Sequence, residues 1–237
     1  MQTNAQIMPL LEVRHLHKEF HLHLVDSRVI SPFNNISFQI LPGQLFLIGG
    51  KSGAGKTTIL KSVYRTYLTT SGEIWYDSQQ FGRVNLATAS EDLIMRLRTR
   101  ELGYCSQFLK VLPRVPALDV TAEPLISCGV PRQDALAEAA KWLQRLQIEE
   151  SRWQASPITF SGGEQQRLNL ARAFIAAPRF LLLDEPTASL DAVSKAIVLE
   201  IIQEARLAGV TMLTVSHDSA TMEPLADQVY RLAIERE

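Results

Sequence analysis

The chain has 237 residues, of which 46% are hydrophobic and 21% are charged, and these values are typical of a globular protein. Its 24 lysines and arginines and 25 aspartates and glutamates give a net charge of -1, which excludes a protein devoted to bulk nucleic-acid binding, because that activity needs a basic excess. Two cysteines, Cys105 and Cys128, are too few for a four-ligand zinc site.

The first part of the chain, residues 10–48, predicts short strands separated by turns. Leu45 to Ile48 is an unbroken apolar run followed by two glycines, which is typical of a strand that is buried on both faces and leads into a tight turn. Residues that favour turns supply the predicted breaks. They are Pro32, the pair Asn34-Asn35 and the pair Pro42-Gly43.

Helices and strands are then predicted along the middle of the chain. A helix is predicted from Thr57 to Tyr67, and two strands, Glu73–Tyr76 and Val84–Leu86, are predicted around a turn at Gly82. Pro131 opens a later helix, in which apolar residues recur at helical spacing. These residues are Leu136, Ala139, Ala140, Leu143 and Leu146.

Helices alternate with apolar strands in the last part of the chain. The predicted helices are Gln165–Ala177, stopped by Pro178, and Ala192–Leu207, ending at Gly209. The predicted strands are Phe180–Leu183, Val210–Val215 and Gln228–Ala233. This alternation predicts an α/β protein whose parallel sheet is covered by helices on both faces.

A phosphate-binding loop is predicted at residues 50–57. Gly50-Lys51-Ser52-Gly53-Ala54-Gly55-Lys56-Thr57 matches the pattern G-x-x-x-x-G-K-[ST] and lies between a buried strand and a helix, the context that the pattern requires. The glycines let backbone N–H groups turn toward phosphate oxygens, and the helix N-terminus adds its positive dipole end. We expect Lys56 to reach the β- and γ-phosphates of a nucleotide and the Thr57 hydroxyl to bind Mg²⁺.

Two carboxylates follow the apolar run at residues 180–183. Asp184, at the carboxyl end of a buried strand, is placed to hold Mg²⁺ directly or through water. Glu185 is the candidate general base that polarises an attacking water. A buried strand that ends in two acids is common on its own. Because the same chain also carries the phosphate loop, the pair becomes strong evidence for a nucleotide site.

A second candidate anion site precedes the helix predicted at residue 165. Ser161-Gly162-Gly163 forms a turn before it, and a helix N-terminus of this kind binds anions. An ordinary helix cap after a flexible turn is the alternative interpretation. Because one active site needs one γ-phosphate cradle, a second cradle in the chain suggests that it serves the nucleotide of another subunit.

With these motifs in this order, the sequence resembles the ABC-type ATPases over nearly its whole length. The resemblance implies a phosphate-loop NTPase fold with a mostly parallel central sheet, an antiparallel β-subdomain at the N-terminus and an α-helical insert at about residues 108–162. It implies one nucleotide-binding domain spanning residues 1–237. ATP and Mg²⁺ are the implied bound species, and a second cassette is the implied partner, with no nucleic acid.

The resemblance also implies roles for individual residues. Gln107 senses Mg²⁺ and the attacking water, His217 contacts the γ-phosphate, and Asp191 lies at the seam of a dimer. Phe20 stands where the family places an aromatic ring that stacks on adenine. The other nucleotide-binding residues implied in this way are Gly50, Ser52, Gly53, Ala54, Gly55, Thr58, Ser161, Gly162 and Gly163.

The motif around Ser161 departs from the commonest form of the family at two positions. Phe160 stands in place of leucine and Glu164 in place of glutamine. Neither change removes the Ser161 hydroxyl or the N–H groups of the two glycines that follow it. We therefore expect the activity to persist.

Two further features have competing interpretations. His15, His17, His21 and His23 alternate on a predicted strand, but no acidic or cysteine cluster accompanies them, so solvated or packed histidines are preferred to a metal site.

The segment after Gln107 is unusually apolar for a loop. It is a candidate docking surface for the partner that the ATPase drives, and packing on the helical insert is an equally good alternative.

One phosphate loop and one Ser-Gly-Gly turn predict that the chain is half of a catalytic pair. This argues against translation factors with two cassettes in one chain. The short spacing between the motifs argues against the chromosome-structure ATPases, in which a long coiled coil separates them. No segment approaches the roughly 20 apolar residues that cross a bilayer. The polar start of the chain lacks the layout of a secretory signal, so we expect a soluble cytoplasmic protein.

Two families remain as candidates. A lone cassette is most commonly the energising subunit of a membrane transporter, and the Ser-Gly-Gly-Glu form occurs in lipoprotein and macrolide exporters. The chain more closely resembles the PhnL family, the L subunits of the bacterial carbon–phosphorus lyase system for phosphonate use, which we prefer. The segments that carry this resemblance are Ser62–Leu68, Ser106–Arg114, Gly129–Arg132, Phe160–Arg167 and Leu182–Asp191.

The preferred resemblance implies a set of partners and a pathway. The L subunit acts with the soluble G, H, I and J components, and a related K cassette is its expected dimer partner. Together with the G, H and I subunits it would assist the formation of α-D-ribose 1-methylphosphonate 5-triphosphate from ATP and methylphosphonate. For a transporter, the partner is instead a transmembrane permease.

Overall fold

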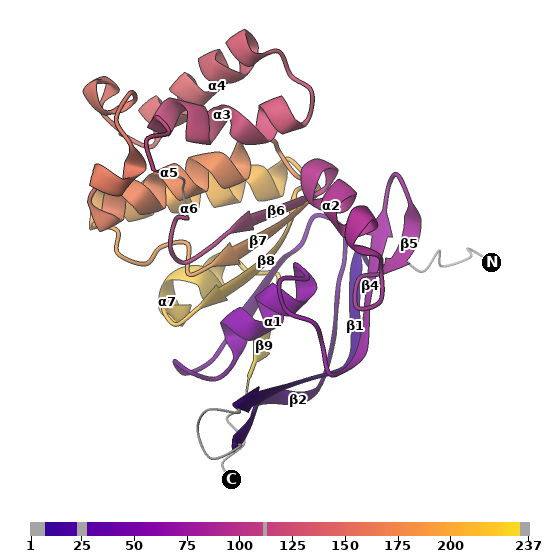
Figure 1. The fold of residues 1–237 in the computed structure, drawn as a ribbon. Helices are drawn as coiled ribbons and strands as arrows, with labels where there is room; N and C mark the ends of the chain where they lie inside the picture. The colour runs from indigo at the N-terminus through magenta and orange to yellow at the C-terminus, as the bar shows by residue number, and fades with distance from the viewer. Residues whose placement is uncertain (1–7, 23–27, 111–112, 233–237) are drawn as a thin grey trace, which may run out of the picture.

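Two sheets of opposite type organise the fold of this computed structural model, which describes residues 8–22, 28–110 and 113–232 (Figure 1). A four-stranded antiparallel sheet has the order β2-β1-β4-β5, and a five-stranded parallel sheet has the order β6-β7-β8-β3-β9. The antiparallel strands are β1 (Leu11–Leu22), β2 (Arg28–Ile40), β4 (Ser71–Ser78) and β5 (Gly82–Asn85). The parallel strands are β3 (Leu45–Gly49), β6 (Leu102–Cys105), β7 (Phe180–Asp184), β8 (Thr211–Ser216) and β9 (Gln228–Arg231).

Helices connect these strands and form an insert above the parallel sheet. The α-helices are α1 (Lys56–Val63), α2 (Glu91–Arg100), α3 (Ala117–Ser127), α4 (Arg132–Arg145), α5 (Gly162–Phe174), α6 (Ala192–Leu207) and α7 (Ser219–Met222). The short 3-10 turns are η1 (Glu150–Arg152), η2 (Pro157–Thr159) and η3 (Glu223–Leu225). In Figure 1, α3 and α4 form a layer beyond α5 and α6, and α1 lies on the opposite side of the parallel strands.

Successive side chains of the parallel strands enter two different cores. Leu182 and Leu213 belong to the core shared with α1, α2 and the antiparallel sheet, whereas Leu181 and Leu183 pack with α5 and α6. Every residue of β3, β7 and β8 is buried, as a parallel sheet covered on both faces requires. The predicted fold class, with its antiparallel N-terminal sheet and helical insert, is confirmed.

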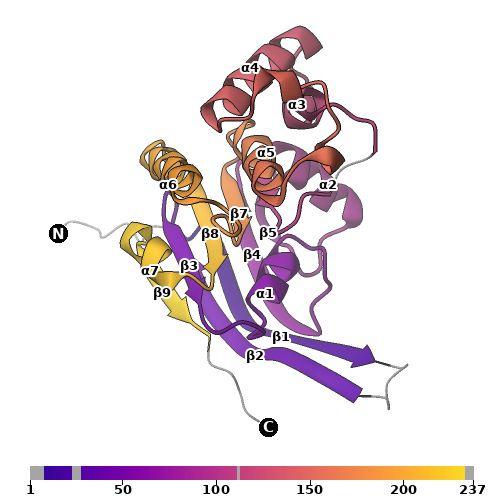
Figure 2. The same ribbon diagram turned by 90° about the vertical axis from the view of Figure 1, so that its left-hand side faces the viewer.

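The first two strands differ from their prediction. The prediction that Pro32 and Asn34-Asn35 break short strands is wrong, because all three residues lie inside the long strand β2. β2 is an edge strand, where a proline can be accommodated without losing a ladder hydrogen bond. Asn35 adopts a left-handed backbone with a φ of 50°, and the pairing of β1 with β2 shifts register along this stretch. In Figure 2 the β1–β2 hairpin extends well away from the parallel sheet.

Other predicted elements begin or end at different residues in the structure. α1 stops at Val63 rather than Tyr67, because Arg65 is left-handed with a φ of 66° and its Nε donates to the Leu86 carbonyl. α5 spans Gly162–Phe174 instead of Gln165–Ala177, whereas α6 has its predicted bounds. α2 and β6 were not predicted, and α3 was expected only as part of the helical insert at about residues 108–162. The last strand, β9, ends at Arg231, and the predicted end of that strand, Ala233, lies outside the described residues.

Glu101 ties the antiparallel sheet to the edge of the parallel sheet. Its side chain is buried, and its two oxygens accept hydrogen bonds from Tyr76 Oη at 2.9 Å and Ser78 Oγ at 2.7 Å. Arg179, just before β7, lies 3.8 Å from the same carboxylate. A buried carboxylate is tolerated in this position because hydroxyl donors and a cation compensate it.

We expect Glu101→Ala to lower the free energy of unfolding by about 2–4 kcal/mol, because it leaves two buried hydroxyls without their acceptor and removes one of the two carboxylates beside Arg179, the other being that of Asp77. Urea denaturation followed by circular dichroism measures this loss. Glu200→Ala, at an exposed position of α6, is the control and is expected to change stability by less than about 0.5 kcal/mol. Equal effects of the two substitutions would contradict the role of Glu101.

Candidate functional site

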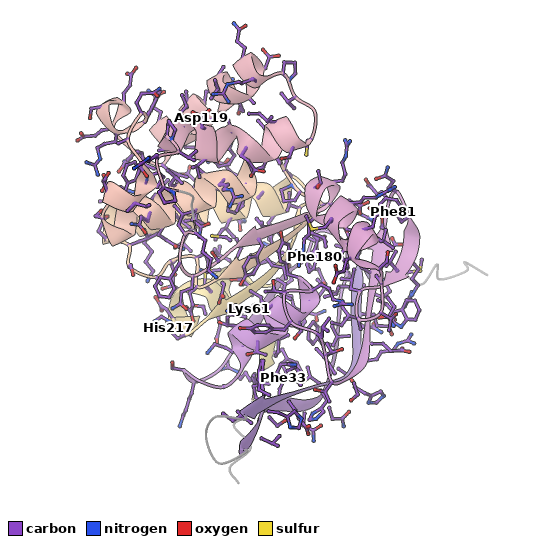
Figure 3. The ribbon with its side chains drawn as sticks, viewed as in Figure 1. Phe33, Lys61, Phe81, Asp119, Phe180 and His217 are labelled. Atoms are coloured by element: carbon purple, nitrogen blue, oxygen red, sulfur yellow. The ribbon has the colours of Figure 1, made fainter. Side chains whose placement is uncertain are left out.

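Four strands of the parallel sheet end at one edge, and each is followed by a residue that the sequence marked as a site candidate. β3 leads into the loop at 50–57, β6 is followed by Gln107, β7 ends in Asp184-Glu185, and β8 is followed by His217. The carboxyl ends of parallel strands meet at one edge, where open α/β sheets bind ligands. Figure 3 shows His217 at this end of the strands, on the side where α1 carries Lys61.

A cavity of about 450 Å³ opens at this edge. Its size lies within the range of small-molecule sites. The residues that line it are Pro32, Ser52, Gly53, Ala54, Gly55, Lys56, Thr57, Thr58, Gln107, Glu185 and His217. The structure therefore brings together the phosphate loop, Gln107 and the residues after β7 and β8, as the sequence predicted.

The loop at 50–57 has the backbone of a phosphate cradle. Gly55 adopts a φ of 89° immediately before α1, and a Cβ at this position would lie 2.5 Å from the carbonyl oxygen of Pro32, so glycine is required. Lys56 is buried, and its Nζ donates to the carbonyls of Gly50 and Lys51, at 2.8 Å each. Phosphate oxygens are stronger acceptors than these carbonyls because they are charged. The lysine is therefore positioned inside the loop to bind an anion.

Asp184 lies between two hydroxyl donors. Thr57 Oγ1 donates to its Oδ1 at 2.8 Å, and Tyr104 Oη donates to its Oδ2 at 3.1 Å. Burial raises the pKa of Asp184, and the two hydrogen bonds oppose this shift. A carboxylate beside a threonine hydroxyl presents hard oxygen atoms, which are the ligands that Mg²⁺ prefers. The residues present therefore fit a magnesium ion.

Tyr104 is a residue of the site that the sequence analysis missed. Its ring stacks on that of Tyr64 with centroids 4.9 Å apart, and the Arg98 guanidinium lies 4.3 Å from the Tyr64 centroid. Burial raises the pKa of Tyr104, so its hydroxyl keeps its proton and remains a donor to Asp184. No local pattern reveals this contact, because it depends on the pairing of β6 with β7.

Glu185 has a strained backbone that turns its side chain toward His217. Its φ is 54°, in the left-handed region that non-glycine residues rarely occupy, and its N–H donates to the Val215 carbonyl at 3.0 Å. Glu185 Oε2 lies 2.8 Å from His217 Nδ1 and accepts the His217 backbone N–H at 3.2 Å. Because a carboxylate only accepts, this contact places a proton on Nδ1 of the histidine.

The turn at Ser161 is closed by reciprocal hydrogen bonds at the start of α5. Ser161 Oγ accepts from the Glu164 N–H at 3.3 Å, and the Glu164 carboxylate accepts from the Ser161 N–H at 2.8 Å. The Ser161 hydroxyl acts here as an acceptor, so its own hydrogen is available to another acceptor. Ser161 and Gly162 are exposed, and none of Ser161, Gly162 and Gly163 lines the cavity.

Asp191 and Phe20 also lie outside the cavity lining. Asp191 caps α6 by accepting the Ser194 N–H at 2.8 Å, and this bond lowers the pKa of Asp191. The Phe20 ring meets Tyr67 edge-on with centroids 5.4 Å apart, and Lys18 Nζ lies 4.6 Å from its centroid. The seam and adenine-stacking roles of these two residues remain predictions.

Two buried side chains of α5 reach the edge of the sheet. Gln166 Nε2 donates to the Pro186 carbonyl at 3.2 Å, and Asn169 Nδ2 donates to the Ser106 carbonyl next to Gln107. The sequence analysis missed both residues. Their polarity at buried helix positions is the signal that could have revealed them, since buried polar groups need hydrogen-bond partners.

The alternative histidine site finds no support in the described ranges. His15 Nδ1 is hydrogen-bonded to Asn35 Oδ1, and His17 Nε2 lies 3.0 Å from Glu19 Oε1. His23 lies outside the described residues. Among residues 8–22, 28–110 and 113–232, no group of three or more metal-ligating side chains is found. Within the same ranges, no helix has both the length and the apolar character needed to cross a membrane.

Comparison with known proteins identifies relatives of this chain. The ABC transporter family model matches residues 33–188. A lipoprotein-releasing system ATP-binding protein LolD from Koribacter versatilis (strain Ellin345) is 37% identical over 202 residues, which cover 85% of this chain and 87% of that protein. A putative peptide import ATP-binding protein from Brucella ovis is 33% identical over 232 residues, which cover 96% of this chain and 70% of that protein.

Solved structures show the same fold. The dimeric structure of MJ0796, described as a bacterial ABC transporter cassette, matches with a TM-score of 0.85 at 24% identity, covering 95% of this chain and 97% of that one. A second dimeric structure of MJ0796, in a post-hydrolysis state bound to ADP and Pi, matches equally well. The fold of the chain is therefore the ABC ATPase fold.

We expect Tyr104→Phe to raise the Mg²⁺ concentration for half-maximal nucleotide binding by about 3- to 10-fold, because Asp184 loses the donor that orients it. Titrating Mg²⁺ against a fluorescent ADP analogue at fixed concentration measures this shift. Tyr76→Phe is the matched control, because it removes another buried hydroxyl from a carboxylate, that of Glu101, away from the cavity. An unchanged Mg²⁺ dependence in Tyr104→Phe would contradict the assignment.

Proposed function

The chain belongs to the ABC transporter family of ATP-hydrolysing cassettes, and from this membership we propose that it works in a pair in which two cassettes enclose each ATP. The separation of its two anion sites carries the proposal. The loop at 50–57 lines the cavity, whereas the Ser161 turn lies outside it, exposed and with a free hydroxyl hydrogen. The turn would then complete the cavity of a second cassette.

The phosphates of ATP bind in the loop at 50–57. Its backbone N–H groups, the start of α1 and Lys56 supply the positive potential that holds them. The other residues that line the cavity here are Ser52, Gly53, Ala54 and Gly55 of the loop and Thr58 of α1. Thr57 and Asp184, with Gln107 from the facing loop, would hold Mg²⁺, which when bound neutralises charge on the phosphates.

Glu185 is the proposed general base for hydrolysis. It accepts a proton from the attacking water as the water oxygen bonds to the γ-phosphorus, while the bond from that phosphorus to the bridging oxygen breaks and ADP leaves. His217 holds the Glu185 carboxylate through Nδ1 and contacts the γ-phosphate, and Gln107 lies in the same cavity. Closure of the second cassette would exclude all water except the attacking one.

The partner that the cassette drives has two candidates. The names of the relatives from Koribacter versatilis and Brucella ovis support the first, a transmembrane permease of a lipoprotein-releasing or peptide import type. The segments quoted in the sequence analysis support the second, the soluble carbon–phosphorus lyase core with a related K cassette. In both cases we place the chain in the cytoplasm.

The segment after Gln107 is the proposed contact with either partner. Phe108 is 71% exposed, which is unusual for a large apolar side chain, while Leu109 packs against the core beside it. A partner bound here would lie next to Gln107 and to the Ser106 carbonyl that Asn169 holds. Motion of the cassettes on hydrolysis would then reach the partner through this segment.

We expect Glu185→Gln to trap ATP in a closed dimer and to slow hydrolysis by about 10²- to 10⁴-fold, because the site loses its base while its shape persists. Phosphate release measures the rate, and light scattering after size-exclusion chromatography measures the dimer. Glu200→Gln, at an exposed position of α6, is the control. Hydrolysis at the wild-type rate would remove Glu185 from the mechanism.

Co-purification from the native host separates the two partners. Recovery of an integral membrane protein without soluble phosphonate-pathway subunits would establish the transporter candidate, and the reverse would establish the lyase candidate. Phe108→Ser is expected to reduce recovery of either partner by about tenfold while leaving the ATPase rate of the isolated chain unchanged. Full recovery with Phe108→Ser would contradict the docking role of this segment.

A further inference from the structure

Both departures from the common form of the Ser161 motif, Phe160 and Glu164, contact one side chain. Arg152 belongs to η1 in the helical insert, and its guanidinium lies 4.8 Å from the centroid of the Phe160 ring. Its Nη2 donates to the Thr159 carbonyl at 3.0 Å. Its Nε lies 3.6 Å from Glu164 Oε1. One arginine therefore contacts residues on both sides of Ser161.

The insert fixes Arg152 in this place. The Arg152 N–H donates to the Glu149 carbonyl at 2.9 Å, and the neighbouring Trp153 indole donates to the Ile148 carbonyl at 2.9 Å. On the other side, Phe160 is buried in the core that α5 and α6 share. A planar cation that stacks on a buried ring and bonds to the backbone holds the chain entering α5 in one position.

Arg152 also lies close to the negative charge of Glu164. Hydrogen bonds from Ser161 lower the pKa of Glu164, so a carboxylate lies within 2.8 Å of the Ser161 backbone nitrogen. A γ-phosphate that approaches the Ser161 hydroxyl meets this negative charge. Arg152 Nε is a buried donor without a hydrogen-bond partner, and it faces the same carboxylate. The cation opposes the repulsion because both charges lie beside the turn.

We propose that Arg152 is a positioning residue for the Ser161 turn, which holds the turn through Thr159 and Phe160 and offsets the charge of Glu164 when the γ-phosphate of the companion cassette arrives. This inference rests on the proposed two-cassette function. It explains the two departures in the motif together: Phe160 supplies an aromatic ring on which the guanidinium stacks, and Glu164 supplies a carboxylate whose charge it offsets.

The test measures ATP-driven dimerisation of the full-length Glu185→Gln chain, followed by light scattering as ATP is titrated. Adding Arg152→Ala is expected to weaken dimerisation on the order of tenfold, because the turn loses its anchor and Glu164 loses one of its two nearby cations, the other being Arg167. The affinity of the separate monomer for a fluorescent ATP analogue is expected to be unchanged, because the phosphate loop is intact. Loss of monomer affinity would overturn the proposal.

Arg145→Ala is the matched control. Arg145 lies on α4 of the same insert, stacks over Trp142 at 5.6 Å and pairs with Glu204 at 2.7 Å. Its side chain is 36% exposed, against 34% for Arg152, so the two substitutions remove similar contacts. Arg145→Ala is expected to leave dimerisation at the level of the parent. Equal dimerisation of the Arg152→Ala and Arg145→Ala variants would overturn the proposal.

A double variant separates charge from simple loss of structure. Glutamine at position 164 still accepts the Ser161 N–H but carries no charge, so Arg152→Ala with Glu164→Gln is expected to recover about half of the lost dimerisation on a logarithmic scale. Absence of recovery would overturn the charge assignment. If the Glu185→Gln parent itself fails to dimerise with ATP, the two-cassette function fails; if it dimerises and Arg152→Ala matches it, the inference about Arg152 fails.

Discussion

The parallel pairing of β3, β7 and β8 is the constraint on which the site depends. Gly49 pairs with Ser216, and Asp184 pairs with Val215, so the phosphate loop, the two carboxylates and His217 leave the sheet at the same edge. Burial of both faces holds this register, because a slip by one residue would exchange the side chains that enter the two cores. The 2.8 Å hydrogen bond from Thr57 to Asp184 follows directly from this alignment.

Helix α5 joins the two proposed anion sites of the chain. Its first turn carries the exposed Ser161 turn, and farther along it Gln166 and Asn169 bond to the backbone at Pro186 and Ser106 beside the cavity. A phosphate that pulls on the turn therefore acts on an element bonded to the residues next to Glu185 and Gln107. In the proposed pair, this hydrogen-bonded connection would relate phosphate binding at one cassette to the residues beside Glu185 and Gln107.

Much of this site is readable from the sequence because its motifs are local. The phosphate loop and the carboxylates after an apolar run each occupy a few consecutive residues. Tyr104 and Arg152 could not be found in this way, because each acts on residues brought near by pairing or by the helical insert. The prediction at Pro32 was wrong for a related reason. Pro32 is tolerated within β2 because β2 is an edge strand, and the order of strands in a sheet cannot be read from a local sequence pattern.

We propose that the Ser161 turn completes the cavity of a second cassette, and a disulfide between two copies of this chain tests this most directly. One copy carries Ser161→Cys and the other Ser52→Cys, both in the Glu185→Gln background with Cys128→Ser, since Cys105 is buried. We expect a cross-linked dimer of unlike copies when ATP is present and none with ADP. A dimer that forms with ATP while both introduced cysteines stay unlinked and fully reactive toward maleimide would contradict it.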